Sequence, residues 1–263
     1  MDENESYRAT RRTVLKVIGG LGALLLVDCD DAVGAGADAG TADAKTASGT
    51  DAGTANGTCV LDPNVTKGPY WVDEKLDRTD VRTDTNGKAS PNPRPGLPLE
   101  LQIAVYAYTS SGCTALAGAQ VDIWHCDASG IYSDTSAQST TGQNFLRGYQ
   151  VTNASGVATF TTIYPGWYSG RTVHIHCKVR VFDASQNTTT EATTQLFFDD
   201  TVTDGVYAAA SPYSSRGARD TRNAADSIYG GHTELLVSLS GDTTAGYAGT
   251  ITLGVAVGTV FSG

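Results

Sequence analysis

Basic side chains are scarce in this sequence. Its 263 residues contain 18 Lys and Arg against 28 Asp and Glu, which gives a formal net charge of −10. Proteins that bind nucleic acid need clustered Lys and Arg to displace counterions from the phosphates. The acidic balance therefore argues against a nucleic-acid partner and suits a soluble catalyst or binding protein.

The five cysteines include no Cys-x-x-Cys pair, so a structural zinc knuckle is not expected. If the protein is exported, a disulfide between two of the last four cysteines is expected. Cys59 with Cys113 is the preferred pair, because both lie at the edges of predicted strands or loops. The sequence alone leaves the connectivity open.

No apolar run near the N-terminus is long enough to cross a bilayer, since the run at residues 17–27 is too short. Paired arginines, Arg11 and Arg12, precede it and resemble a twin-arginine signal. The alternative is an ordinary secretory signal with a chance Arg pair. We predict that residues 1–29 are a twin-arginine-like signal of a bacterial protein. The exported protein would be periplasmic, extracellular or lipid-anchored at Cys29, although Asp28 is a poor residue before a lipidated cysteine.

Residues 30–57 contain Ala, Gly, Thr and Asp and almost no large apolar side chain. Such a segment cannot bury enough surface to offset the entropy of ordering it, so a disordered linker is predicted. The folded domain is expected to occupy residues 58–263. With 40% hydrophobic residues in the chain, a sizeable core is possible.

No window of that domain shows a sustained helical period. Short segments instead alternate apolar and polar residues, as half-buried strands do, and turn residues separate them. We predict an all-β fold, an antiparallel β-sandwich of short strands with long loops. The polar loop at residues 208–231 is interpreted as a site lid or a loosely ordered segment. The predicted strands are residues 99–105, 120–124, 156–163, 173–182, 193–198, 233–239 and 250–257.

Two of the four histidines, His174 and His176, would share one face of a predicted strand. Two imidazoles at this spacing can hold one metal ion. Taken alone, a His-x-His pair is weak evidence, because many such pairs are merely hydrogen-bonded. Here, however, Tyr168 and Arg171 lie just upstream, after a bend at Pro165-Gly166 that could bring Tyr168 to the same point.

A second tyrosine, Tyr132, follows a similar turn. If Tyr132, Tyr168, His174 and His176 converge, two phenolates and two imidazoles favour a hard, highly charged ion, Fe³⁺, over Zn²⁺ or Cu⁺. A ligand with two adjacent hydroxyls could then bind as a dianion, since such an ion lowers the pKa of bound hydroxyls. Arg171 is placed to hold negative charge that develops during a reaction.

Several spaced motifs resemble the intradiol ring-cleavage dioxygenases. The nearest group is the secreted, single-domain one similar to the β chain of protocatechuate 3,4-dioxygenase. The resemblance covers roughly residues 59–198, and several motifs in the expected order are more specific than any one of them. The motifs are Lys67-Gly68-Pro69-Tyr70, residues 78–82, residues 121–127 with 130–133, residues 145–148, and residues 164–168 with Arg171 and His174-Ile175-His176.

The resemblance implies a non-haem Fe(III) enzyme that inserts both atoms of O₂ between the two hydroxylated carbons of a catechol-type substrate. The product would be a cis,cis-muconate-type diacid. Tyr132 and His174 match the equatorial ligands, and Tyr168 and His176 match the axial ones. Tyr168 would also accept a substrate proton, Arg171 would stabilise the ketonised substrate, and Gln195 matches the glutamine beside the active site.

Some features depart from the family pattern. The family usually has an acidic residue where Lys67 stands, and the segment between Tyr168 and His174 is shorter than in well-known protocatechuate enzymes. The preferred substrate (catechol, protocatechuate, hydroxyquinol or a lignin-derived diol) therefore stays open, as does the oligomeric state.

The alternative hypothesis is a non-catalytic extracytoplasmic β-sandwich module that binds carbohydrate or a ferric–catecholate. The presence of all four ligand residues with Arg171 and Gln195 favours the enzyme. A copper oxidase would use the two histidines but leave both tyrosines unexplained.

Overall fold

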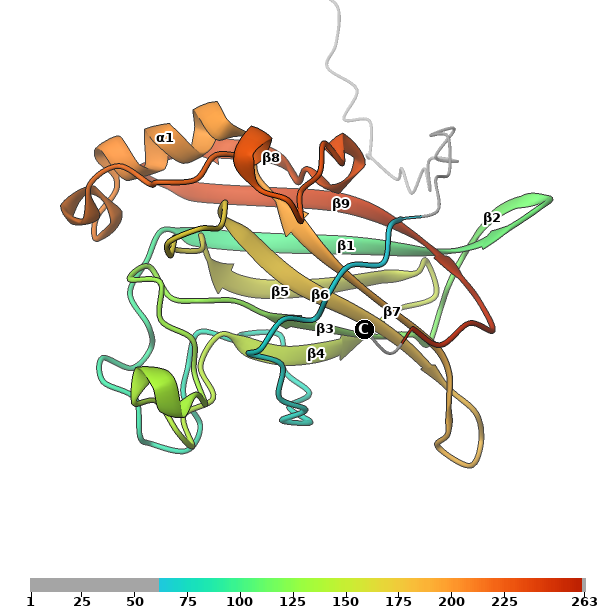
Figure 1. Cartoon of the computed structure of the whole chain (residues 1–263). Coiled ribbons are helices and arrows are strands. Elements are labelled where there is room, and N and C mark those ends of the chain that lie inside the picture. The colour runs from blue at the N-terminus through green and yellow to red at the C-terminus, as the bar shows by residue number, and fades with distance from the viewer. Residues whose placement is uncertain (1–61, 262–263) are drawn as a thin grey trace, which may run out of the picture. The chain divides into compact units, whose positions relative to one another are not determined.

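The computed structural model describes residues 62–261, and these residues form two β-sheets packed as a sandwich with one short α-helix (Figure 1). The predicted β-sandwich is confirmed. The signal at residues 1–29, the possible lipid anchor at Cys29 and the linker at residues 30–57 lie outside the described residues and stay predictions. The domain start at residue 58 stays a prediction for the same reason.

The first sheet is organised around its longest strand, β1 (Pro98–Thr109). On one side β1 pairs with β9 (Gly246–Ala256), which in turn pairs with β8 (Ser238–Asp242). On the other side β1 pairs with β5 (Val157–Ile163) and β2 (Gly112–Ala115). The pairing of β1 with β9 is parallel, which the prediction of an antiparallel sandwich missed. Parallel neighbours need a long connection, and here the whole second sheet lies between them in sequence.

The second sheet has the order β4-β3-β6-β7 and is antiparallel throughout. Its strands are β4 (Arg147–Val151), β3 (Gln120–Trp124), β6 (His174–Phe182) and β7 (Thr188–Phe197). Both faces of the first seven residues of β6 are buried. One face packs into the core between the sheets, and the other face lies under residues 66–71.

Strand alternation decides which β6 side chains reach the core. Ile175, Cys177 and Val179 belong to the main hydrophobic core, together with alternate β1 residues such as Leu101 and Ile103. His174 and His176, one residue out of phase, project from the opposite face. Core packing therefore fixes the register that directs both imidazoles outward.

Six of the seven predicted strands fall on β1, β3, β5, β6, β7 and β9. The prediction for residues 233–239 is wrong at its start, because Thr233–Leu235 forms a 3-10 helix and β8 begins only at Ser238. Strands β2 and β4 were not predicted. The other 3-10 helices are Ser136–Gln138, Tyr213–Arg216 and Asn223–Ala225.

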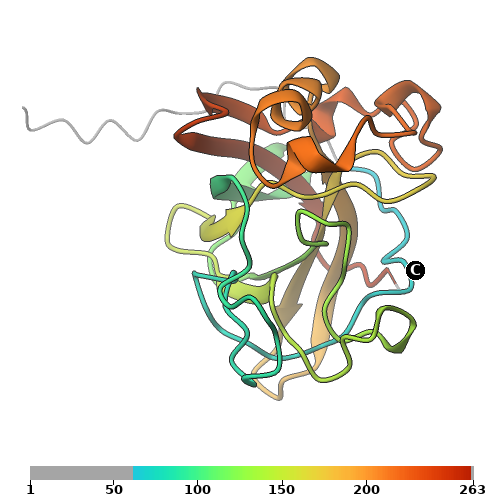
Figure 2. The ribbon, with the colours of Figure 1, turned by 90° about the vertical axis from the view of Figure 1, so that its left-hand side faces the viewer.

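The helix α1 (Asp200–Ala209) was also not predicted. The Asp199 side chain caps it by accepting hydrogen bonds from the amides of Thr201 (2.7 Å) and Val202 (3.2 Å). Only ten residues long, it buries just three side chains, too few to give a helical period in the sequence. Figure 2 shows α1 and the loops that follow it above the strands. Within residues 62–261, no helix is long and apolar enough to cross a membrane.

The cysteines divide into two kinds. Cys113 is disulfide-bonded, whereas Cys126 and Cys177 are buried and free. The predicted pairing of Cys113 with Cys59 involves a residue outside the described part of the chain and stays a prediction.

Candidate functional site

Strand β6 brings the two histidines together at the end of the second sheet. The Nε2 atoms of His174 and His176 lie 3.3 Å apart, and both side chains are buried. In the strand register His176 lies between Trp124 of β3 and Gln195 of β7. Its ring stacks on Trp124, with a centroid distance of 4.8 Å and an interplanar angle of 6°.

Both imidazoles are prepared to offer a lone pair. The Nδ1 of His174 donates to the carbonyl of Thr172 at 2.7 Å, which leaves Nε2 unprotonated in the neutral ring. Burial, followed by the nearby Arg171 charge, lowers the pKa of His174 to about 3. Burial and His174 lower the pKa of His176 well below its usual value. Both rings are therefore neutral at neutral pH, as metal ligands must be.

The two predicted tyrosines reach the same point. The hydroxyl of Tyr132 lies 3.4 Å from the Nε2 of His174, and that of Tyr168 lies 3.2 Å from the same atom. Two ligand atoms that each lie about 2 Å from one metal ion are separated by about 3 Å when they are neighbours in its coordination sphere. The other three donor atoms thus lie around the His174 Nε2 at the spacing of neighbouring ligands in one coordination sphere.

The protonation states of the tyrosines limit the kind of cation that could bind to both of them. Burial raises the pKa of Tyr168 to about 12 and that of Tyr132 well above its usual value. Both phenols would therefore keep their protons unless a strong positive charge displaced them. Within residues 62–261, no group of three or more His, Cys, Asp or Glu side chains could hold a metal ion. Two phenol oxygens with two imidazole nitrogens suit Fe(III).

Two glycines allow the tyrosine-bearing turns to meet. A Cβ on Gly130, two residues before Tyr132, would lie 2.3 Å from the carbonyl oxygen of Trp167. A Cβ on Gly166, two residues before Tyr168, would lie 2.2 Å from the carbonyl oxygen of Asp127. Only glycine permits such close backbone contacts on both sides.

The N-terminal segment, residues 66–71, covers the site. Gly68 lies against His176, and the Tyr70 ring stacks on Tyr132 at 4.3 Å. Arg147 holds this arrangement, because its guanidinium donates to the carbonyls of Tyr70 and Ser133, both at 2.6 Å. Sequence motifs predicted that these segments belong together but did not reveal this role for Arg147.

Arg171 and Gln195 are adjacent, as the resemblance implied. Arg171 Nη2 donates to Gln195 Oε1 at 2.5 Å, and Gln195 Nε2 donates to the carbonyl of Thr66 at 3.1 Å. Arg171 Nε donates to Asp226 at 2.8 Å. Burial opposes ionisation of Asp226, but Arg171 and two backbone amides hold the pKa of that carboxyl below its usual value. Nothing in the sequence marked Asp226, which lies in the polar loop at residues 208–231.

The fold and this cluster define a β-sandwich protein with a candidate mononuclear metal site built from two phenols and two imidazoles. A family model described as Dioxygenase matches residues 66–223. The chain belongs to the intradiol ring-cleavage dioxygenase family, which confirms the resemblance.

Solved structures agree with this assignment. An intradiol ring-cleavage dioxygenase from Tetranychus urticae is 28% identical with a TM-score of 0.64, over 78% of this chain and 98% of that chain. The dioxygenase domain of a carbohydrate-binding fusion protein from Streptomyces sp. SirexAA-E is 27% identical with a TM-score of 0.53, over 75% and 99% of the chains. The fold is also shared by the 3-chlorocatechol 1,2-dioxygenase of Rhodococcus opacus 1CP. That protein is 18% identical with a TM-score of 0.52, over 74% of this chain and 73% of that chain. A search of curated proteins finds no match.

Proposed function

We propose that this protein is an Fe(III)-dependent intradiol dioxygenase. It would cleave the ring of a catechol-type substrate between the two hydroxylated carbons, consuming O₂ and giving a cis,cis-muconate-type diacid. The observation that carries the proposal is the convergence on the His174 Nε2 of the Tyr132 hydroxyl (3.4 Å), the Tyr168 hydroxyl (3.2 Å) and the His176 Nε2 (3.3 Å). Family membership supports the reaction class.

Tyr132, Tyr168, His174 and His176 would hold the metal ion. Bound there, Fe(III) would lower the pKa of the substrate hydroxyls and make the ring reactive toward O₂. Two tyrosinates would offset most of the ionic charge, which reduces the cost of burying it. The stacking of Trp124 on His176 and of Tyr70 on Tyr132 keeps two of the ligand rings in place.

Tyr168 is the better placed of the two phenols to exchange a proton. Tyr132 is fully buried, whereas Tyr168 is half-buried and so has room to move. Its Oη would accept the proton of a substrate hydroxyl, because a free phenolate with a pKa of about 12 is a strong base. Tyr132 would stay in place throughout.

Arg171 would stabilise the negative charge that develops on a substrate oxygen. Its Nε and Nη2 donate hydrogen bonds to Asp226 and Gln195. Within residues 62–261, Nη1 donates to no side chain or carbonyl. A guanidinium N–H directed at a developing oxyanion in a buried site can contribute a large part of a rate enhancement.

Ring cleavage and iron content test this proposal together. Protein purified with iron should be burgundy and should consume O₂ and form muconate-type products from catechol, protocatechuate, hydroxyquinol or a lignin-derived diol. The relative rates would identify the substrate. A colourless preparation that cannot be reconstituted with iron and yields no product would instead support a binding module for carbohydrate or ferric–catecholate.

We also propose export by the twin-arginine route, supported only by the Arg11-Arg12 pair and the apolar run that follows. Replacing both arginines by lysine should leave the protein in the cytoplasmic fraction. Unchanged export of that variant would contradict the proposal.

A further inference from the structure

The guanidinium of Arg171 is fixed from two sides. Asp226 Oδ2 accepts from Nε at 2.8 Å, and Gln195 Oε1 accepts from Nη2 at 2.5 Å. The exposed fraction of the Arg171 side chain is 19%, and that of Asp226 is 0%. Since these contacts use the N–H groups of Nε and Nη2, the N–H groups of Nη1 are left for a substrate.

The Asp226 carboxylate is itself rigidly held. Besides Arg171, Oδ2 accepts from the amide of Thr172 at 2.8 Å. Oδ1 accepts from the amides of Ile228 (2.8 Å) and Tyr229 (3.0 Å). Four donors thus fix both oxygens, and a buried carboxylate with this set of partners cannot rotate without losing several of them.

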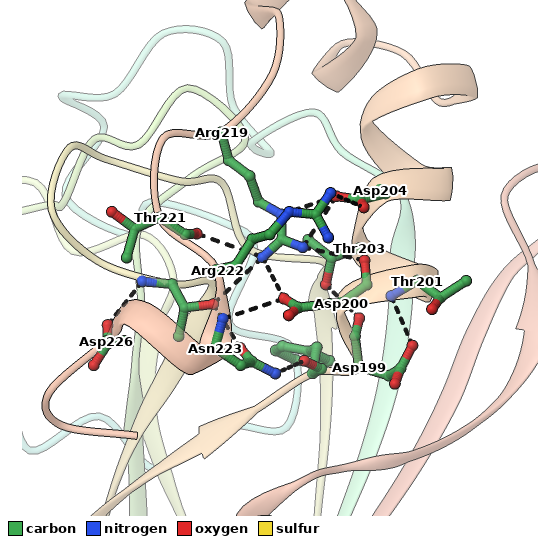
Figure 3. Close-up of polar contacts among 12 residues, drawn as sticks. Asp199, Asp200, Thr201, Thr203, Asp204, Arg219, Thr221, Arg222, Asn223 and Asp226 are labelled. Carbon is green, nitrogen blue, oxygen red and sulfur yellow. Dashed lines mark hydrogen bonds and ion pairs between the residues drawn. The ribbon is translucent and has the colours of Figure 1, made fainter. Parts of the chain in front are cut away.

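The segment around Asp226 is tied to α1, as Figure 3 shows. The Asn223 amide donates to Asp200 at 3.3 Å, and the Asn223 side chain donates to the carbonyl of Phe198 at 2.8 Å. Arg219, whose side chain is buried, pairs with Asp200 (2.7 Å) and Asp204 (3.0 Å) on the helix. The predicted lid or loosely ordered loop is therefore a fixed support at this point.

This support also reaches the candidate metal ligands. Thr172 Oγ1 donates to Asn223 at 2.6 Å, and the Thr172 carbonyl accepts from the Nδ1 of His174 at 2.7 Å. The segment from Asn223 to Tyr229 consequently holds Arg171 and Thr172 as one unit.

We propose that Asp226 is the positioning residue for Arg171: it sets the guanidinium in the orientation from which Nη1 stabilises the developing substrate anion. The polar loop after α1 is then part of the active site. This inference rests on the proposed function for its catalytic consequence, whereas the contact between Asp226 and residues 171–172 does not depend on a metal.

A double-mutant cycle tests the inference. Asp226→Asn keeps the shape of the side chain but removes its charge. The Asn NH2 group is a donor, so it would face N–H groups that the carboxylate oxygen accepts from. It should lower kcat by about 10²-fold, the typical effect of an ångström-scale misplacement, while KM and the iron content change little. In an Arg171→Ala background the same substitution should have a much smaller effect on kcat, because most of its influence passes through Arg171 and only the remainder through Thr172. An equal loss in both backgrounds, or no loss in either, would overturn the proposal.

A matched control comes from the same loop. Asp220 is exposed and accepts from the amide of Gly170 at 3.2 Å without touching Arg171. Asp220→Asn should leave kcat unchanged. If Asp226→Asn fails to fold, Asp226→Glu keeps the charge but displaces the carboxylate by one methylene. It should lose kcat in the same Arg171-dependent way, and unchanged kcat would count against the proposal.

Hydrogen exchange in the metal-free protein separates this inference from the proposed function. The amide of Thr172 should exchange faster in Asp226→Asn than in the unsubstituted protein, and Asp220→Asn should not change it. Unchanged exchange in Asp226→Asn would overturn the positioning role itself. Absence of ring cleavage in the unsubstituted protein would instead overturn the proposed function.

Discussion

At the scale of single residues, the site depends on four side chains and on the two glycines that let their turns meet. Strand alternation predicted that His174 and His176 share a face, because that requires only the local backbone. The turns before Tyr132 and Tyr168 made both tyrosines candidates, but their assignment as ligands came from the motif resemblance, since no local rule brings two turns 36 residues apart in sequence to one point. Asp226 could not be predicted, because an aspartate in a polar loop has no distinguishing pattern.

Tyr168→Phe tests the proton-accepting role. Removing the hydroxyl should lower turnover by about 10²-fold or more, the usual contribution of general base catalysis. Much of the iron should remain, because Tyr132, His174 and His176 are unchanged. Steady-state kinetics and iron analysis measure the two effects. Tyr108→Phe, at an exposed position on β1, should change neither; unaltered turnover in Tyr168→Phe would show that the assigned role is wrong.

Gly68→Ala tests how closely the N-terminal segment fits over His176. Gly68 has a φ of +69°, and an added Cβ would lie 3.3 Å from the Cε1 of His176. Gly87→Ala is a matched control, because its φ is +67° and its Cβ would meet nothing within 4 Å. Both variants should lose about 1–2 kcal/mol of unfolding free energy to backbone strain. Only Gly68→Ala should also weaken iron binding, and equal iron affinity in the two variants would contradict this contact.

At the scale of elements, periodicity predicted the strands that carry the site but not all their neighbours. β6 alternates core and site residues along its buried part and lies entirely within the predicted strand at residues 173–182. β4 begins with Arg147, a buried guanidinium that binds backbone carbonyls, so it lacks the expected alternation of apolar residues. The helix α1 begins at a capping aspartate rather than an apolar period.

Asp199→Ala tests the contribution of that cap to the helix under the Asp226 loop. Losing the hydrogen bonds to the amides of Thr201 and Val202 should lower the unfolding free energy by about 1 kcal/mol. Urea unfolding monitors the change. Thr201→Ala, at an exposed position in the first turn, should stay within about 0.5 kcal/mol of the unsubstituted protein. Equal effects of the two substitutions would argue against the cap.

At the scale of the whole described domain, contacts between distant segments decide the arrangement. The parallel pairing of β1 with β9 joins residues about 150 apart in sequence, and local patterns carry no information on it. Residues 62–71 likewise cross from β9 to the site. Asp62 exchanges backbone and side-chain hydrogen bonds with Gly254, and Thr66 accepts from Gln195.

The contact between Asp62 and Gly254 should make stability depend on pH. Burial raises the pKa of its carboxyl from 3.8 to about 7 in the folded protein. Between pH 4 and 7 the folded state therefore binds a proton that the unfolded state has released. The contribution of protonated Asp62 to the unfolding free energy is therefore fully present below pH 4, and it is lost as the pH rises through 7. The unfolding free energy of the unsubstituted protein, relative to Asp62→Asn, should fall over this range by up to about 1.4 kcal/mol per pH unit. A constant difference across these pH values would contradict the prediction.

Resonance Raman spectroscopy of the iron-loaded protein, excited in its visible charge-transfer band, tests the central claim most directly. If Tyr132, Tyr168, His174 and His176 bind one ferric ion, the spectrum should contain ring vibrations of two distinct tyrosinates. Tyr132→Phe and Tyr168→Phe should each remove a different set. Iron that gives no tyrosinate vibrations, or a spectrum that neither substitution changes, would show that the metal is not held by these residues.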